Sequence, residues 1–125
     1  MEILASRVLV RPADFDRSVG FYRDVVGLPI YREFAGGVVF FLGGGYLEVS
    51  GNGGRPANEK LQVWLQVRDV DSAYRELEAA GVEIIEIPVD KPWGLREMRA
   101  IDPDGVRLVF VEVPEDHPLR RDTRS

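Results

Sequence analysis

The residues Arg7–Ile30, RVLVRPADFDRSVGFYRDVVGLPI, set the architecture, because a second stretch of the chain repeats their pattern. That second stretch is Gln62–Ile85, QVWLQVRDVDSAYRELEAAGVEII. Each begins with alternating apolar residues, which is typical of a strand with one face in a core. Each then reaches an Asp-apolar-Asp step, in which Asp14 and Asp69 occupy the same place. The repeat predicts two similar modules in tandem.

Each of these aspartates is expected to begin a helix. A carboxylate at this position accepts hydrogen bonds from the free N–H groups of the first turn and complements the helix dipole. Apolar residues then recur at helical spacing, and Tyr22 and Tyr74 fall at positions that favour the core over an acid–base role. Both helices are expected to end at a glycine, Gly27 or Gly81, because glycine suits a left-handed C-terminal cap.

Three strand signals follow each helix. They cover residues 29–34, 37–42 and 46–50 in the first module, and residues 83–89, 95–101 and 106–113 in the second. Glycine-rich turns and an Asp-Pro-Asp-Gly turn separate them. The sequence therefore predicts an α+β fold of two tandem βαβββ modules that form a cupped mixed sheet, with the helices outside.

The two modules, at about residues 5–50 and 61–113, are expected to form a single domain over residues 1–113. A Gly-rich linker, residues 51–60, joins them, and a polar tail, residues 114–125, follows. A half of about fifty residues is marginal alone, so the modules must share a core or an assembly. The tail contains His117, which we expect to be solvated because no residue nearby in the sequence would orient it.

Composition narrows the range of functions. The chain has 125 residues, no cysteine, one histidine, and 21 acidic against 16 basic side chains, a formal net charge of −5. The cysteine and histidine counts exclude disulfides, thiolate metal sites and the HExxH zinc motif. The net charge of −5 argues against nucleic acid as a partner, because nucleic-acid affinity rests on clustered Lys and Arg. No apolar run approaches the roughly 20 residues of a membrane span, so we expect no membrane partner and a cytoplasmic protein.

Strand alternation also sorts the side chains by sheet face. The residues expected to pack on the helices are Val8, Val10, Leu47, Val49, Val63, Leu65, Val67, Leu108 and Phe110. The opposite faces then carry Arg7, Leu9, Arg11, Tyr46, Glu48, Ser50, Gln62, Trp64, Gln66, Arg107, Val109 and Val111. This second set mixes charges, amides, aromatic and aliphatic groups. Such a mixture predicts a concave pocket with an apolar floor and a few polar anchors.

Three segments resemble a known family. They are the Asp-Phe-x-x-Ser-x-x-Phe-Tyr-x-x-x-x-Gly pattern of Asp14–Gly27, its counterpart Asp69–Gly81, and Trp93-Gly94-Leu95-Arg96-Glu97 running into Asp102–Gly105. Together they are similar to the vicinal oxygen chelate superfamily of glyoxalases, extradiol dioxygenases and bleomycin-resistance proteins, over roughly residues 5–113. The Trp-Gly-x-Arg-Glu segment is most similar to the bleomycin-resistance branch. A fold shared with this superfamily does not by itself give the function.

The resemblance implies where metal ligands would stand. The four ligand positions of metal-using members fall on Arg7, Glu48, Gln62 and Val109. Valine has no donor atom, and a permanently cationic guanidinium repels a metal while pairing with Glu48. We therefore expect no metal and no cofactor, and we expect Arg7 to contact Glu48 or an acidic group of the ligand.

The leading hypothesis is that the protein binds or sequesters a small molecule without a metal. Antibiotics are among the candidate ligands. Tyr46, Trp64 and Trp93 would stack on an aromatic or cationic ligand. Arg7, Glu48 and Gln62 would be polar anchors, with Val109 in the same ligand-binding set. Two alternatives stay open: a metal-dependent lyase, isomerase or dioxygenase in which Glu48 is a base or ligand, and an accessory domain whose cup is filled by its own side chains. The resemblance also implies a homodimer, with modules paired within a chain or exchanged between chains.

Overall fold

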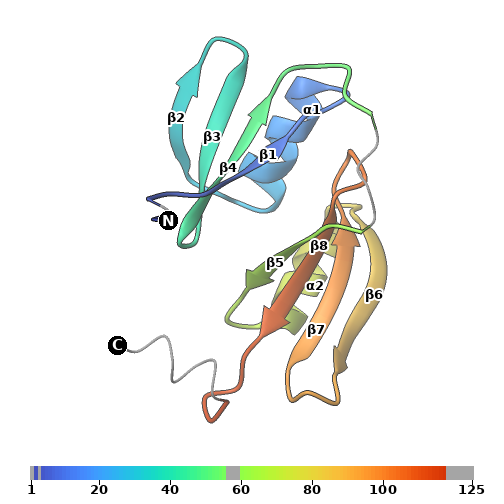
Figure 1. Ribbon diagram of the computed structural model, residues 1–125. Helices are drawn as coiled ribbons and strands as arrows, with labels where there is room; N and C mark the ends of the chain where they lie inside the picture. Colours follow the sequence, from blue (N-terminus) through green and yellow to red (C-terminus); the bar gives the residue numbers. More distant parts are fainter. Residues whose placement is uncertain (1, 3, 56–59, 118–125) are drawn as a thin grey trace. The chain divides into compact units, whose positions relative to one another are not determined.

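The computed structural model describes residues 2, 4–55 and 60–117. The chain divides into two compact units, Met1–Ala57 and Asn58–Ser125, here called unit 1 and unit 2. Each unit contains one four-stranded mixed sheet (Figure 1). No helix in the described part of the chain is both long enough and apolar enough to cross a membrane.

Unit 1 has the predicted order of elements. They are β1 (Arg7–Val10), α1 (Phe15–Gly20), the π-helical segment η1 (Phe21–Val25), β2 (Ile30–Phe34), β3 (Gly37–Leu42) and β4 (Gly45–Ser50). The strand order in the sheet is β1-β4-β3-β2, with β1 parallel to β4 and the other pairs antiparallel. The short helix packs on β4.

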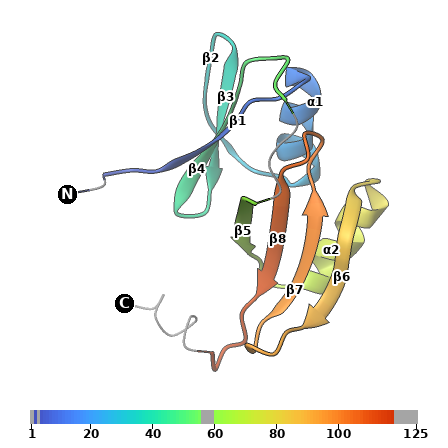
Figure 2. The same ribbon diagram turned by 45° about the vertical axis from the view of Figure 1, so that its right-hand side comes forward.

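Unit 2 repeats this arrangement. Its elements are β5 (Gln62–Gln66), α2 (Val70–Ala79), β6 (Glu83–Asp90), β7 (Arg96–Ile101) and β8 (Arg107–Glu112). The strand order β5-β8-β7-β6 can be followed in Figure 2, and α2 packs against β6, β7 and β8. The prediction of two tandem βαβββ modules is therefore confirmed. A cup shared by both modules stays a prediction.

Both helices begin at the aspartates that the sequence indicates. Asp14 Oδ1 accepts a hydrogen bond from the N–H of Arg17 at 3.1 Å, and Asp69 Oδ1 accepts one from Ser72 at 3.0 Å. Each helix is followed by a glycine with positive φ, 80° at Gly27 and 76° at Gly81. The predicted N-terminal and C-terminal signals of both helices are confirmed.

The first helix differs from the prediction in its second half. Residues Phe21–Val25 form a π-helical turn, in which the N–H of Val26 donates to the carbonyl of Phe21 at 3.0 Å. The wider turn accompanies the burial of two successive aromatic side chains, Phe21 and Tyr22, which pack edge to face with ring centroids 5.0 Å apart. Helical spacing alone gives no sign of this widening.

Of the nine side chains predicted to face the helices, five are buried in the core, three are half-buried and one is exposed. Val10, Leu47, Val49, Leu108 and Phe110 are buried as predicted, and so is Tyr22. Val63, Leu65 and Val67 are half-buried, and so is Tyr74, whose hydroxyl donates to Glu78 at 2.6 Å. Val8 is 37% exposed, because β1 is the edge strand of its sheet and α1 packs on β4 instead.

The start of the predicted linker is attached to unit 1. The N–H groups of Gly53 and Gly54 donate to the carbonyls of Ala13 and Pro12 at 3.1 and 3.0 Å. A Cβ atom at Gly54 would collide with the backbone carbonyl of Arg11, so this close approach requires glycine. Residues 56–59 of the linker and residues 118–125 of the tail lie outside the described residues.

Candidate functional site

The sheet of unit 1 presents one face away from α1, here called the open face of unit 1. The register aligns Arg7, Tyr46 and Phe41 in one row, and Leu9 and Glu48 in the next. Paired residues of neighbouring strands project to the same side of a sheet. Three predicted site residues, Arg7, Tyr46 and Glu48, are therefore brought together on this face.

Glu48 is the centre of a hydrogen-bonded network on this face. Its Oε1 accepts a hydrogen bond from Arg7 Nη1 at 2.7 Å, which confirms the predicted contact. Its Oε2 accepts from Ser50 Oγ at 2.7 Å and lies 3.7 Å from Arg11 Nη1, which also donates to Ser50 Oγ. The hydrogen bond from Ser50, followed by that from Arg7, lowers the pKa of the Glu48 carboxyl. Both carboxylate oxygens are therefore engaged.

This lowered pKa predicts how stability changes with pH. A carboxyl whose folded pKa lies below its ordinary value of 4.5 adds stability above that value and loses it as the pH falls through the folded pKa. We expect the protein to be more stable than its Glu48→Gln variant near neutral pH, by a margin that shrinks below about pH 4. Thermal unfolding of both proteins across this range measures the margin, with the exposed Glu33→Gln variant as control. A margin that does not change with pH would contradict the prediction.

An exposed aromatic cluster lies beside this network. It consists of Tyr31, Phe41 and Tyr46, whose ring centroids lie 4.9 to 5.9 Å apart. The Arg7 guanidinium carbon is 5.9 Å from the Tyr46 centroid, so Arg7 contacts both the network and the cluster. Sequence reasoning assigned only Tyr46. An irregularity in the pairing between Ile30 and Arg32 displaces β2 from strict alternation, which conceals the position of Tyr31.

The corresponding open face of unit 2 is organised around Arg99. The register aligns Trp64, Val109 and Arg99 in one row across three strands. Arg99 Nε donates to Gln62 Oε1 at 3.2 Å, and Nη1 donates to Glu86 Oε1 at 2.8 Å. Three of the predicted site residues, Gln62, Trp64 and Val109, therefore share this face, and the sequence analysis did not identify Arg99 as their link.

A buried carboxylate, Glu97, lies on the same face. Its Oε2 accepts the indole N–H of Trp93 at 2.7 Å, and its Oε1 is 3.8 Å from Arg99 Nη2. Glu97 is 4% exposed, whereas Trp93 is 56% exposed, with Lys91 Nζ 5.8 Å from its ring centroid. Lys91 also pairs with Glu86 at 2.8 Å, and its hydrogen bond is the main cause that lowers the pKa of the Glu86 carboxyl.

Sequence reasoning quoted Glu97 within the Trp-Gly-x-Arg-Glu segment but gave it no role. Three of the six residues of its strand, Arg96–Ile101, are charged, so the sequence offers no signal that Glu97 is buried. Its partner on the neighbouring strand is Val111, which forms one buried apolar cluster with Leu95, Val109 and Val113.

The expectation that no residue orients His117 is wrong, although its contact lies on the exposed surface. Its ring Nε2 lies 3.3 Å from the carbonyl oxygen of Trp93, and the side chain is half-buried. Gly94 in this loop has a φ of 90°, a conformation that favours glycine, and a Cβ there would make only an ordinary contact with the imidazole, at 3.4 Å. The contact spans 24 positions of sequence, which local pattern cannot indicate.

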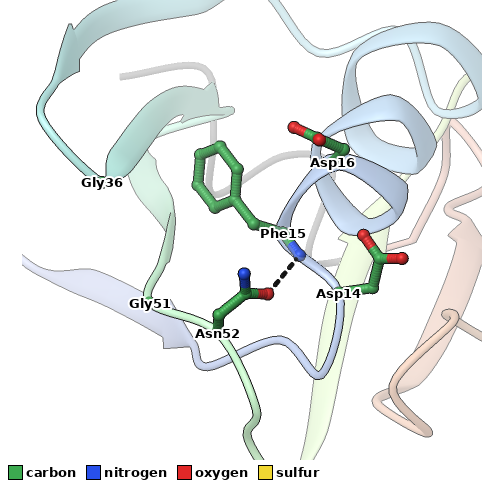
Figure 3. A pocket seen from close by; sticks show the side chains of 6 residues that line it. All are labelled: Asp14, Phe15, Asp16, Gly36, Gly51 and Asn52. Carbon is green, nitrogen blue, oxygen red and sulfur yellow. Dashed lines mark hydrogen bonds between the residues drawn. The ribbon is translucent and has the colours of Figure 1, made fainter.

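A separate hollow of about 350 Å³ lies at the start of α1, and all of its lining residues belong to unit 1. Figure 3 shows Asp14, Phe15, Asp16 and Asn52 around it, with Gly36 and Gly51 at its edge. Its polar groups hold the backbone: Asn52 Oδ1 accepts the N–H of Phe15 at 2.8 Å, and Asp14 caps the helix. None of the predicted ligand-binding residues lines it.

Within the described ranges, the one group of three acidic side chains near enough to share a metal is Asp69, Asp71 and Glu112. Each of them already has a structural partner. Asp69 caps α2, Glu112 accepts the N–H of Val70 at 3.0 Å, and Asp71 pairs with Arg96 at 2.9 Å. The cluster is accounted for by the beginning of a helix and one ion pair.

The four family metal positions do not offer a suitable donor set. In unit 1, Glu48 Oε1 accepts from Arg7, so a guanidinium stands beside the carboxylate that a metal would need. In unit 2, Gln62 Oε1 accepts from Arg99, and Val109 has no donor atom. Divalent cations require several neutral or anionic donors around one point. The residues present therefore do not fit a divalent metal.

Comparisons with known proteins agree with this architecture. The family model described as Glyoxalase/Bleomycin resistance protein/Dioxygenase superfamily matches residues 5–110. The Bacillus subtilis (strain 168) protein YraH is 32% identical over 120 residues, which cover 83% of this chain and 92% of YraH.

Solved structures show the same fold. A protein of unknown function from Agrobacterium tumefaciens is 27% identical, with a TM-score of 0.73 over 91% of this chain and 95% of that one. A glyoxalase/bleomycin resistance protein/dioxygenase from Nocardioides gives a TM-score of 0.76 at 20% identity, over 94% of this chain and 87% of its own.

Proposed function

Because the chain belongs to the glyoxalase/bleomycin resistance protein/dioxygenase superfamily, we propose that it binds a small organic molecule on its open sheet faces without a divalent metal. One observation carries the proposal: the Arg7 guanidinium donates at 2.7 Å to the carboxylate of Glu48, the acidic residue at the family metal positions. A metal at Glu48 would have to displace that cation and would meet its repulsion, which disfavours binding of a divalent ion.

The side chains on the two faces support binding of an organic ligand. Unit 1 offers the aromatic cluster beside Arg7, and unit 2 offers Trp64, 49% exposed, and Trp93 beside Glu97. Exposed aromatic rings next to fixed polar groups are typical of small-molecule sites. The role of each residue as a ligand contact is part of the proposal.

The enzyme alternative has less support from Glu48. A general base works best when its pKa lies near the working pH and its oxygen is free to reach a proton. The pKa of Glu48 is lowered, and both of its oxygens accept hydrogen bonds.

The homodimer implied by the resemblance is also part of the proposal, and sedimentation equilibrium at micromolar concentration tests it.

Metal titration tests the proposed function directly. We expect chelator-treated, untagged protein to give no micromolar binding of Zn²⁺, Ni²⁺ or Mn²⁺ in a calorimetric titration, because the donors at the family positions are paired or absent. Two variants locate any metal that does bind. Micromolar affinity abolished by Glu48→Ala would contradict the proposal, whereas affinity abolished by Asp71→Asn would place the ion at the acidic cluster beside α2.

A further inference from the structure

The open face of unit 1 has a positive charge balance, although the whole chain has a formal net charge of −5. Arg7 and Arg11 reach this face through their contacts with Glu48 and Ser50. Arg32 joins the row of Glu48, because it pairs with Val39, which in turn pairs with Glu48. Three guanidinium groups therefore share this face, whereas the network described above contains one carboxylate, that of Glu48.

Glu48 cannot neutralise these cations. One carboxylate balances one guanidinium, yet both Arg7 and Arg11 lie on Glu48, at 2.7 and 3.7 Å. The Arg11 side chain is 60% exposed, so a ligand can reach it from solvent. Within the described part of the chain Arg32 forms no ion pair, and its guanidinium lies 5.4 Å from the Phe34 ring centroid. Surplus positive charge beside a low-dielectric sheet attracts anions.

The aromatic cluster adjoins this charge. Tyr31 and Phe41 are 48% and 40% exposed, and Tyr46 lies beneath the Arg7 guanidinium. A planar ring can therefore stack against the cluster while a group attached to it reaches the arginines. The planar fork of a guanidinium matches a carboxylate or a phosphate with two parallel hydrogen bonds.

We propose that the open face of unit 1 binds a planar aromatic anion, a ring that bears a carboxylate or a phosphate. The ring stacks on Tyr31, Phe41 and Tyr46, and the anionic group accepts hydrogen bonds from Arg7 and Arg11. Glu48 holds both arginines in place and limits the excess charge. This inference rests on the proposed binding function and specifies its ligand class, in place of the broader aromatic or cationic ligand that the sequence suggests.

Four naphthyl compounds of matched shape test the ligand class by calorimetric titration of the full chain: 2-naphthoate, 2-naphthyl phosphate, 2-naphthamide and 2-naphthylmethylamine. We expect at least one anion to bind about tenfold more tightly than the neutral amide, because hydrogen bonds to charged groups are the stronger ones. The tighter of the two anions identifies carboxylate or phosphate as the preferred group. A higher salt concentration should lower the affinity of the protein for the anions and leave its affinity for the amide unchanged.

Charge-altering variants locate the binding to this face. Arg11→Gln should lower the affinity for the anion about tenfold, because it removes one of the two charged donors. Glu48→Gln should raise the affinity for the anion and lower the affinity for the amine, because it removes the negative charge of the face. Arg23→Gln, on η1 and paired with Asp24, is the control and should change neither. Arg11 is mostly exposed, so its substitution leaves the core intact, and thermal unfolding verifies this.

Three results would overturn the inference: tighter binding of the amine than of both anions, no binding of any naphthyl compound at millimolar concentration, or anion binding that survives Arg11→Gln and is lost in Arg99→Gln. Each of these leaves the proposed metal-independent binding standing, because that proposal fails only if metal binds with micromolar affinity through Glu48. The two failures are therefore distinguishable.

Discussion

The double variant Arg7→His, Val109→Glu is expected to bind Zn²⁺ or Ni²⁺, whereas the unaltered protein is expected not to bind them. The first change removes the guanidinium that donates to Glu48 Oε1 and replaces it with a neutral imidazole donor. The second supplies a carboxylate at the position where valine has no donor atom. Glu48 and Gln62 keep their oxygen donors, so each of the four positions that the resemblance gives for metal ligands then bears a nitrogen or oxygen donor. We expect an affinity at least about 100-fold above that of the unaltered protein, measured by calorimetry.

The single variants separate the two causes. Arg7→Met removes the positive charge without adding a donor, and it should give little metal affinity, whereas Arg7→His should give a small gain. Val109 is 5% exposed, so circular dichroism must show that Val109→Glu still folds before its titration is interpreted. Equal affinity of the unaltered protein and the double variant would mean that Arg7 does not prevent metal binding.

The fold could be predicted from local signals in the sequence. Helix beginnings follow from Asp14 and Asp69, whose side chains bond to backbone groups three residues away. Helix ends follow from Gly27 and Gly81, which supply the positive φ that other residues avoid. Each signal acts within one turn of backbone, so its effect does not depend on the rest of the molecule. This is why the order βαβββ was correct, and the predicted strand limits agree with the structure to within one residue.

The site could be predicted only in part, because its contacts join distant residues. Alternation brought Arg7 and Glu48 to one face, and their contact spans 41 positions along the chain. The links made by Arg99 depend on the register of β7 with its neighbours and on a side chain long enough to cross strands. The irregular pairing near Tyr31 shifts the alternation on which the face assignment rests. Register and bulges arise from tertiary packing, which a sequence pattern does not specify.

Replacement of Arg99 should also destabilise unit 2. Arg99 contacts Gln62 and Glu86 and is the cation near the buried Glu97, at 3.8 Å. Replacing it with methionine keeps much of the volume but leaves the Glu97 carboxylate with the Trp93 indole as its hydrogen-bond donor. Breaking a buried pair from one side leaves an uncompensated charge, and we expect a loss of about 2–4 kcal/mol in the free energy of unfolding.

Urea unfolding followed by tryptophan fluorescence measures this loss in unit 2 specifically, because both tryptophans of the chain, Trp64 and Trp93, belong to that unit. The exposed Arg75→Met variant on α2 is the matched control and should stay within about 0.5 kcal/mol of the unaltered protein. Adding Glu97→Gln to Arg99→Met should recover part of the loss, since it removes the charge left without its cation. If Arg99→Met behaves like Arg75→Met, or if Glu97→Gln adds its full cost to that of Arg99→Met, Arg99 does not stabilise the buried carboxylate.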